Sequence, residues 1–100
     1  IKANLEDFIK ISSKLLKDKG DFYMVHRPDR LVDIIDILRK YKLEPKIIRF
    51  IHPSVKKAPN MLLIKATKNA RPFLKVENPL YVYKENGDYT DEILKIYNKK

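Results

Sequence analysis

The sequence has 100 residues, 44% of them hydrophobic and 35% charged, which is the composition of one globular domain and not of a disordered chain. It contains no cysteine, which excludes disulfides and a thiolate nucleophile, and its apolar runs are too short for a membrane span. The formal net charge of +9 favours a polyanionic partner, nucleic acid before membrane, with a solubilising lysine surface as the alternative.

The first predicted element is an amphipathic helix over residues 4–18. Asn4 is placed to cap its N-terminus, and Gly20 is expected to stop it. The apolar residues that recur at helical spacing are Leu5, Phe8, Ile9, Leu15 and Leu16.

A strand–helix–strand unit is predicted next. Asp21–His26 is an aromatic and branched run between a glycine and a proline, which indicates a strand. A second helix is expected to be capped near Asp29 and to end around Tyr41. Lys46–His52, which lies between two prolines, predicts another strand. Because the connecting helix has about a dozen residues, the two strands are expected to be parallel, with a right-handed crossover.

Met61–Thr67 is the third predicted strand. The eight residues before it suit a hairpin, so it should run antiparallel to the preceding strand. Spacing alone leaves open whether it joins at the sheet edge or between the two parallel strands. Residues 69–100 form an irregular tail, extended over 74–83, with a tight turn at 86–87 and a short helix capped by Thr90.

Candidate binding residues gather where the two parallel strands are predicted to end. Ligands of open α/β sheets bind outside these carboxyl ends, and a basic rim there suits nucleic-acid phosphates. The residues are His26, Arg27, Arg30, His52, Lys56 and Lys57. Structural alternatives stay open: the histidines as hydrogen-bonded structural residues, Arg27 paired with Asp29 or Asp33, and the two lysines as a solvated loop tip.

Other chemistries have weaker support. Tyr81, Tyr83 and Tyr89 interleave with Lys75 and Lys84, and they either offer stacking platforms for bases or are half-buried sheet residues. No carboxylate cluster accompanies the histidines, so no metal site is expected. The two glycines lie too far apart in the sequence for a phosphate-binding loop.

The order of elements and the local sequence motifs resemble the C-terminal half of a known family, the SAM-dependent methyltransferases that modify adenine in valine tRNA. The most specific motifs are FYMVHRPDRL at 22–31 and NGDYTDEILKIY at 86–97, and the resemblance covers nearly the whole chain. It implies an α/β, Rossmann-like methyltransferase fold whose first half is missing from residues 1–100. It also implies that Met61–Thr67 is inserted between the two parallel strands, with helices flanking the sheet.

The resemblance implies that the chain supplies scaffold and a basic substrate-facing rim to a cytoplasmic enzyme that uses S-adenosylmethionine to methylate adenine in tRNA. The family's cofactor-binding and catalytic positions have no counterparts here, so no catalytic, cofactor or metal residue is assigned. The chain alone is expected to bind no SAM and to be inactive. Asn78-Pro79-Leu80-Tyr81 is close to the family's Asn-Pro-Pro-Tyr box, but that box follows the fourth strand, upstream of residues 1–100.

Two alternatives remain beside the expectation that the chain is a piece of a longer protein. One is a free-standing basic nucleic-acid-binding module, although KIIRFIHP lacks the glycine and spaced aromatics of an RNA-recognition motif. The other is a dimerisation domain. A strand over residues 22–25 that has lost its neighbour would expose an unpaired edge, so the isolated chain is expected to self-associate there. No membrane partner is expected.

Overall fold

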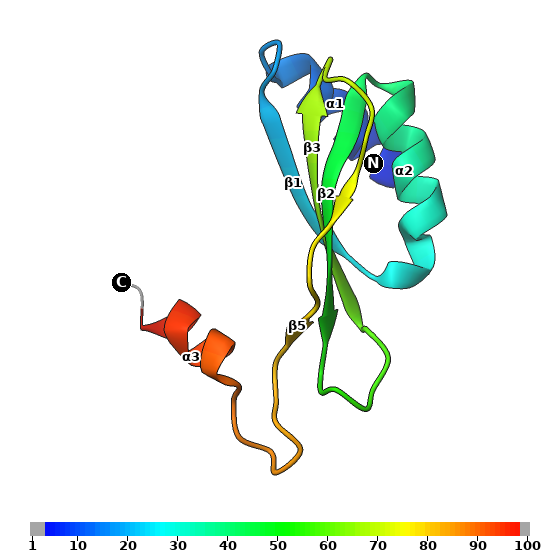
Figure 1. The fold of residues 1–100 in the computed structure, drawn as a ribbon. Helices are drawn as coiled ribbons and strands as arrows, with labels where there is room; N and C mark the ends of the chain where they lie inside the picture. Colours follow the sequence, from blue (N-terminus) through cyan, green and yellow to red (C-terminus); the bar gives the residue numbers. More distant parts are fainter. Residues whose placement is uncertain (1–3, 99–100) are drawn as a thin grey trace.

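The computed structural model describes residues 4–98 (Figure 1). The single-domain prediction for residues 1–100 therefore includes five residues outside this range. The elements are α1 (Leu5–Leu15), β1 (Asp21–His26), a 3-10 turn (Pro28–Arg30), α2 (Leu31–Lys40), β2 (Leu43–His52), β3 (Met61–Lys68), β4 (Lys75–Val76), β5 (Leu80–Tyr81) and α3 (Asp91–Tyr97).

The five strands form one mixed sheet in the order β1-β3-β2-β4, with β5 also paired to β2. β3 runs antiparallel to both of its neighbours, so β1 and β2 are parallel to each other. In the middle of the sheet, Ile64 of β3 lies opposite Met24 of β1 and Ile48 of β2. The inserted position of the third strand, which spacing had left open, is the one that the resemblance implied.

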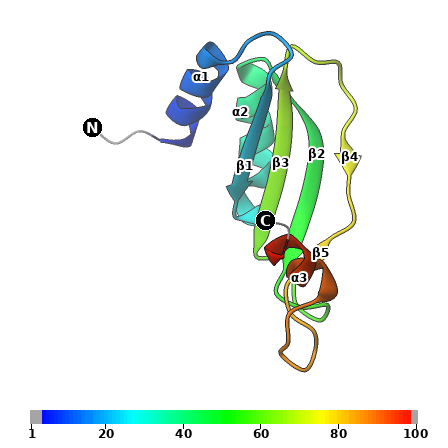
Figure 2. The same cartoon turned by 90° about the vertical axis from the view of Figure 1, so that its left-hand side faces the viewer.

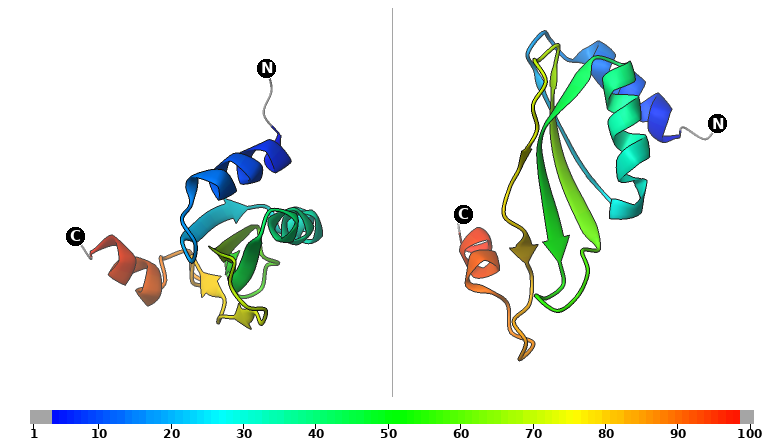
Figure 3. Two further views of the ribbon diagram at one scale, coloured as in Figure 1. Left: turned by 90° about the horizontal axis from the view of Figure 1, so that it is seen from above. Right: turned by 45° about the vertical axis from the view of Figure 1, so that its right-hand side comes forward.

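The helices α1 and α2 pack together on one face of the sheet, and α3 lies on the opposite side (Figures 2 and 3). Alternate residues of β1 and β3 point into the helix-covered face and join the two helices in one core. The fully buried members are Ile9, Ile34, Leu38, Leu43, Leu62, Ile64 and Ala66. On the other face, Tyr23 is 63% exposed and Val25 is 51% exposed, so this side of β1 is open to solvent.

The first helix ends earlier than predicted, at Leu15. The Lys68 ammonium donates hydrogen bonds to the carbonyls of Ser13 (2.5 Å) and Leu16 (2.9 Å), and so satisfies acceptors that the helix end leaves unpaired. The left-handed residue of the following turn is Lys19 (φ 65°), not Gly20. Gly20 matters for space, because a Cβ there would lie 2.9 Å from the Lys17 carbonyl oxygen.

Two other predicted boundaries were wrong, and both involve prolines. Asp29 does not cap the second helix: it lies in the 3-10 turn that Pro28 begins, and α2 starts after it without a side-chain cap. β2 begins at Leu43, three residues earlier than predicted, because the strand continues through Pro45. The ladder to β3 shifts register between Pro45 and Ile47, which accommodates a residue that has no N–H to donate.

The tail follows the outer edge of β2. β4 and β5 are two-residue strands that pair parallel with β2, and Pro79 lies between them outside both ladders. The predicted turn is present: Gly87 has φ 93°, and the Asn86 side chain accepts a hydrogen bond from the Asp88 N–H (3.0 Å). Thr90 caps α3 as predicted.

Candidate functional site

All six predicted rim residues lie at one end of the sheet, at or just beyond the carboxyl ends of β1 and β2. Leu62 of β3 is in register with His26 on one side and with Phe50 on the other, and His52 follows two residues after Phe50. β3 therefore separates the rim into two groups. One precedes α2 and consists of His26, Arg27 and Arg30; the other belongs to the β2–β3 connection and consists of His52, Lys56 and Lys57.

The group before α2 is paired with its own carboxylates. Arg27 lies 3.6 Å from Asp29, and the Arg30 Nε donates to Asp33 Oδ2 at 3.2 Å. Of the two pairings considered for Arg27, the structure contains the one with Asp29. The His26 Nδ1 accepts the Arg27 backbone N–H at 2.8 Å, which fixes the ring against the chain that follows it. Both ion pairs are exposed, and such pairs are weak enough for a phosphate to compete with the carboxylates.

The second group surrounds His52. Its Nδ1 lies 2.8 Å from the Lys57 carbonyl oxygen, so this nitrogen carries the proton and donates it to that oxygen. The ring also packs against Tyr81, with centroids 5.1 Å apart. Lys56 pairs with Glu85 at 3.4 Å, whereas Lys57 has no carboxylate within ion-pair distance among residues 4–98. Lys57 borders an open hollow of about 410 Å³ lined by Pro53, Ser54, Lys57, Tyr83, Lys84 and Gly87.

The three tyrosines of the tail pack mainly with other aromatic rings. Tyr83 stacks on Tyr89, with centroids 5.1 Å apart and an interplanar angle of 22°. The Tyr89 ring also packs at a tilt against Tyr97, with ring centroids 6.2 Å apart. Tyr81, which contacts His52, is half-buried in the sheet as one of the two predictions has it, whereas Tyr83 and Tyr89 are exposed and stack on each other.

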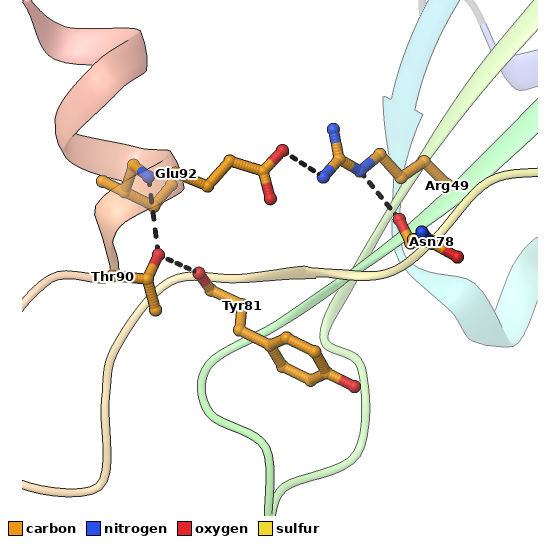
Figure 4. Close-up of polar contacts among 6 residues, drawn as sticks. Arg49, Asn78, Tyr81, Thr90 and Glu92 are labelled. Carbon is orange, nitrogen blue, oxygen red and sulfur yellow. Dashed lines mark hydrogen bonds and ion pairs between the residues drawn. The ribbon is translucent and has the colours of Figure 1, made fainter.

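Asn78-Pro79-Leu80-Tyr81 serves as an attachment point for α3 (Figure 4). The Asn78 carbonyl accepts the Arg49 Nε–H at 3.0 Å, and the same guanidinium pairs with Glu92 of α3. The Tyr81 carbonyl accepts the Thr90 hydroxyl at 2.6 Å. On this segment the acceptors are main-chain oxygens, so the attachment does not depend on the side chain of Asn78.

A second basic surface, which sequence reasoning missed, lies at the opposite end of the sheet. Its residues are Lys17, Lys19, Lys42 and Arg71, hereafter the amino-end patch. All four are exposed, and no carboxylate of the described chain lies within ion-pair distance of them. Backbone bonds from Lys19 N to Lys68 O (3.0 Å) and from Asn69 N to Lys42 O (2.9 Å) join the separate turns that carry them. Because these turns are distant in sequence, no run of residues indicates the patch.

Two further features restrict the chemistry of residues 4–98. No group of three or more histidine and carboxylate side chains in this range is placed to hold a metal ion. No helix in it combines the length and the apolar character needed to cross a membrane.

No protein-family model matches the chain, and no curated protein matches it significantly. Among solved structures, it is similar to the crystal structure of a predicted O-methyltransferase, protein Atu636 from Agrobacterium tumefaciens, with a TM-score of 0.84 and 23% sequence identity. The match covers 93% of this chain and 45% of that one, so this chain spans less than half the length of that protein. At this identity the likeness establishes the fold: residues 4–98 adopt a methyltransferase-type α/β fold over part of such a domain.

Proposed function

We propose that this chain is the C-terminal portion of a SAM-dependent methyltransferase that acts on adenine in tRNA. The observation that carries the proposal is the structural match, which extends over 93% of the chain. The sequence motifs at 22–31 and 86–97 favour the tRNA-modifying family over others that share the fold. The basic rim at the carboxyl ends of β1 and β2 supports a polyanionic substrate, since this is where α/β sheets bind their ligands.

In this proposal the chain contributes scaffold and substrate contacts. Arg27, Arg30, Lys56 and Lys57 contact tRNA phosphates, and the first three exchange their weak carboxylate partners for them. His26 and His52, both fixed by backbone hydrogen bonds, shape the edge between the two groups.

Residues 4–98 do not fit a SAM pocket by themselves. A pocket for the cofactor needs a glycine-rich turn after a parallel strand, and the one glycine with positive φ in this range, Gly87, lies in the turn before α3. The groups that hold the cofactor and orient the adenine amine are therefore assigned to the part of the enzyme outside this chain.

The test uses the protein encoded by the whole reading frame and follows labelled methyl groups from SAM into tRNA, with nucleoside analysis of the product. Arg27→Gln/Arg30→Gln and Lys56→Gln/Lys57→Gln are each expected to raise the KM for tRNA while leaving kcat nearly unchanged. Each pair should also lower the slope of log KM against log salt by about 1–2, since two phosphate contacts are lost. Lys10→Gln, on the exposed side of α1, is the control and should change neither quantity.

Methyl transfer to a small molecule or protein, with none to nucleic acid, would contradict the substrate assignment. The alternative of a nucleic-acid-binding module gains support if residues 1–100 bind RNA in a salt-dependent way but the whole reading frame transfers no methyl group.

We also propose that the isolated chain self-associates through β1. Within the described residues β1 pairs only with β3, and its open face exposes Tyr23 and Val25. Unpaired edges with apolar neighbours tend to pair with another copy. Light scattering should show a mass that rises with concentration, and a strictly monomeric chain at high concentration would refute this.

A further inference from the structure

The loop between β3 and β4, residues 69–74, is held in place at the amino-end patch. The Lys46 ammonium donates to the carbonyls of Arg71 (2.9 Å) and Pro72 (3.1 Å). The Asn69 side chain donates to Asp18 at 2.8 Å, and its backbone N–H donates to Lys42. The loop therefore has a defined position beside the first half of β2.

This loop presents Phe73 to solvent. The side chain is 87% exposed, and the backbone has φ 93°, in the left-handed region that favours glycine. A bulky residue at such an angle is strained, and an exposed phenylalanine gains nothing from burial in the core. Neither the local backbone nor the packing of the described chain therefore explains why an aromatic residue stands here.

The cations of the amino-end patch, which adjoins the loop that carries Phe73, have fewer carboxylate partners than those of the carboxyl-end rim. At the rim, Arg27, Arg30 and Lys56 each lie beside a carboxylate. In the amino-end patch, Arg71 and Lys42 have no such neighbour in residues 4–98, and the Lys19 ammonium bonds a backbone carbonyl, that of Asn69. Cations without carboxylate partners, on the same surface as an exposed aromatic side chain, are a combination with which proteins bind single-stranded nucleic acid.

We propose that Phe73 and the amino-end patch form a second RNA contact, at which an unpaired base stacks on the Phe73 ring and its flanking phosphates lie against Arg71, Lys42 and Lys19. The identity of the partner as RNA rests on the proposed function. β2 has ten residues, so its first end, where Lys42 lies, is roughly 30 Å from the carboxyl-end rim. A partner that bridges this contact and the rim is therefore a polynucleotide, because a single nucleotide cannot reach both.

The experiment measures binding of the chain to a labelled single-stranded RNA of about 12 nucleotides and to a duplex of the same length, by fluorescence anisotropy at several salt concentrations. Phe73→Gly is expected to weaken single-strand binding roughly 5- to 100-fold and to leave duplex binding almost unchanged. Phe73→Tyr keeps a ring and should bind as the parent does. Arg71→Gln/Lys42→Gln should weaken both complexes and lower the single-strand salt slope by about 1.4.

Thermal unfolding separates binding from folding. Phe73→Gly should unfold at the same or a higher temperature, because glycine adopts this φ without strain. If Phe73→Gly binds single strands as tightly as the parent, or weakens duplex binding to the same extent, stacking is refuted. If it instead abolishes self-association with RNA affinity intact, Phe73 contacts protein and the proposal falls.

The methyl-transfer assay keeps the two proposals distinguishable. Methylation of tRNA with unchanged KM in Phe73→Gly and Arg71→Gln/Lys42→Gln would overturn the second contact alone. If the whole reading frame transfers no methyl group but Phe73→Gly still weakens binding to single-stranded RNA selectively, only the enzymatic function is overturned.

Discussion

Lys68→Met tests whether one ammonium group holds the C-terminal end of α1. The group donates to the carbonyls of Ser13 and Leu16, and the side chain is partly buried between β3 and the helix. Methionine retains most of the packing volume but leaves both carbonyls without this donor. A hydrogen bond to a charged group contributes about 1.5–3 kcal/mol; because water reaches the exposed side of this site, we expect a total loss of about 2 kcal/mol.

For a domain of this size, that loss corresponds to a decrease in Tm of roughly 8–16 °C. Urea unfolding followed by circular dichroism measures the free energy directly. Lys65→Met is the matched control, since it lies in the same strand and its ammonium is 3.8 Å from Asp21; its effect should stay within about 0.5 kcal/mol. A loss for Lys68→Met no larger than that of the control would refute the capping role.

Three further outcomes are expected. Ile64→Ala removes a fully buried side chain from the central strand and should lower the free energy of unfolding by about 2–5 kcal/mol; a loss below about 1 kcal/mol would contradict the core described here. Thr90→Ala removes the cap of α3 and should cost about 1 kcal/mol locally, visible as faster amide exchange in α3, whereas Thr90→Ser should not. Hydrogen bonds from Lys40 and Tyr41 lower the pKa of Glu6 below 4.5, so its stabilisation is present above that pH and is lost as pH falls through the lowered pKa. Glu6→Gln should remove this part of the acid dependence of Tm, and an unchanged acid profile would count against it.

Local patterns predicted most of the elements because the residues that form the core recur at helix or strand spacing along the sequence. β1 was predicted with its observed bounds, and β3 differs by one residue. The errors occur where a distant group intervenes. The end of α1 depends on Lys68, more than fifty residues later in the sequence, and the start of β2 depends on a register shift that lets Pro45 lie inside a strand.

The position of the candidate site could be predicted from the sequence, but which of its cations are paired with carboxylates could not. The rim residues lie at strand ends, a property of topology that the sequence order already contains. Whether a rim cation has a carboxylate partner depends on side-chain geometry: Glu85, which pairs with Lys56, comes from the tail of the chain. The amino-end patch could not be predicted, because its cations come from turns that only the folded sheet brings together.

The attachment of the tail to β2 has a consequence for local opening. β4 and β5 contribute two residues each to their ladders, and the Arg49–Glu92 pair fastens α3 across the open face (Figure 4). β3, in contrast, pairs with β2 along almost its entire length. The segment that carries β4, β5 and α3 is therefore expected to open locally at a lower free energy than the ladders of β1, β3 and β2. Such an opening would uncover the second edge of β2 and carry the stacked Tyr83–Tyr89 pair away from the sheet.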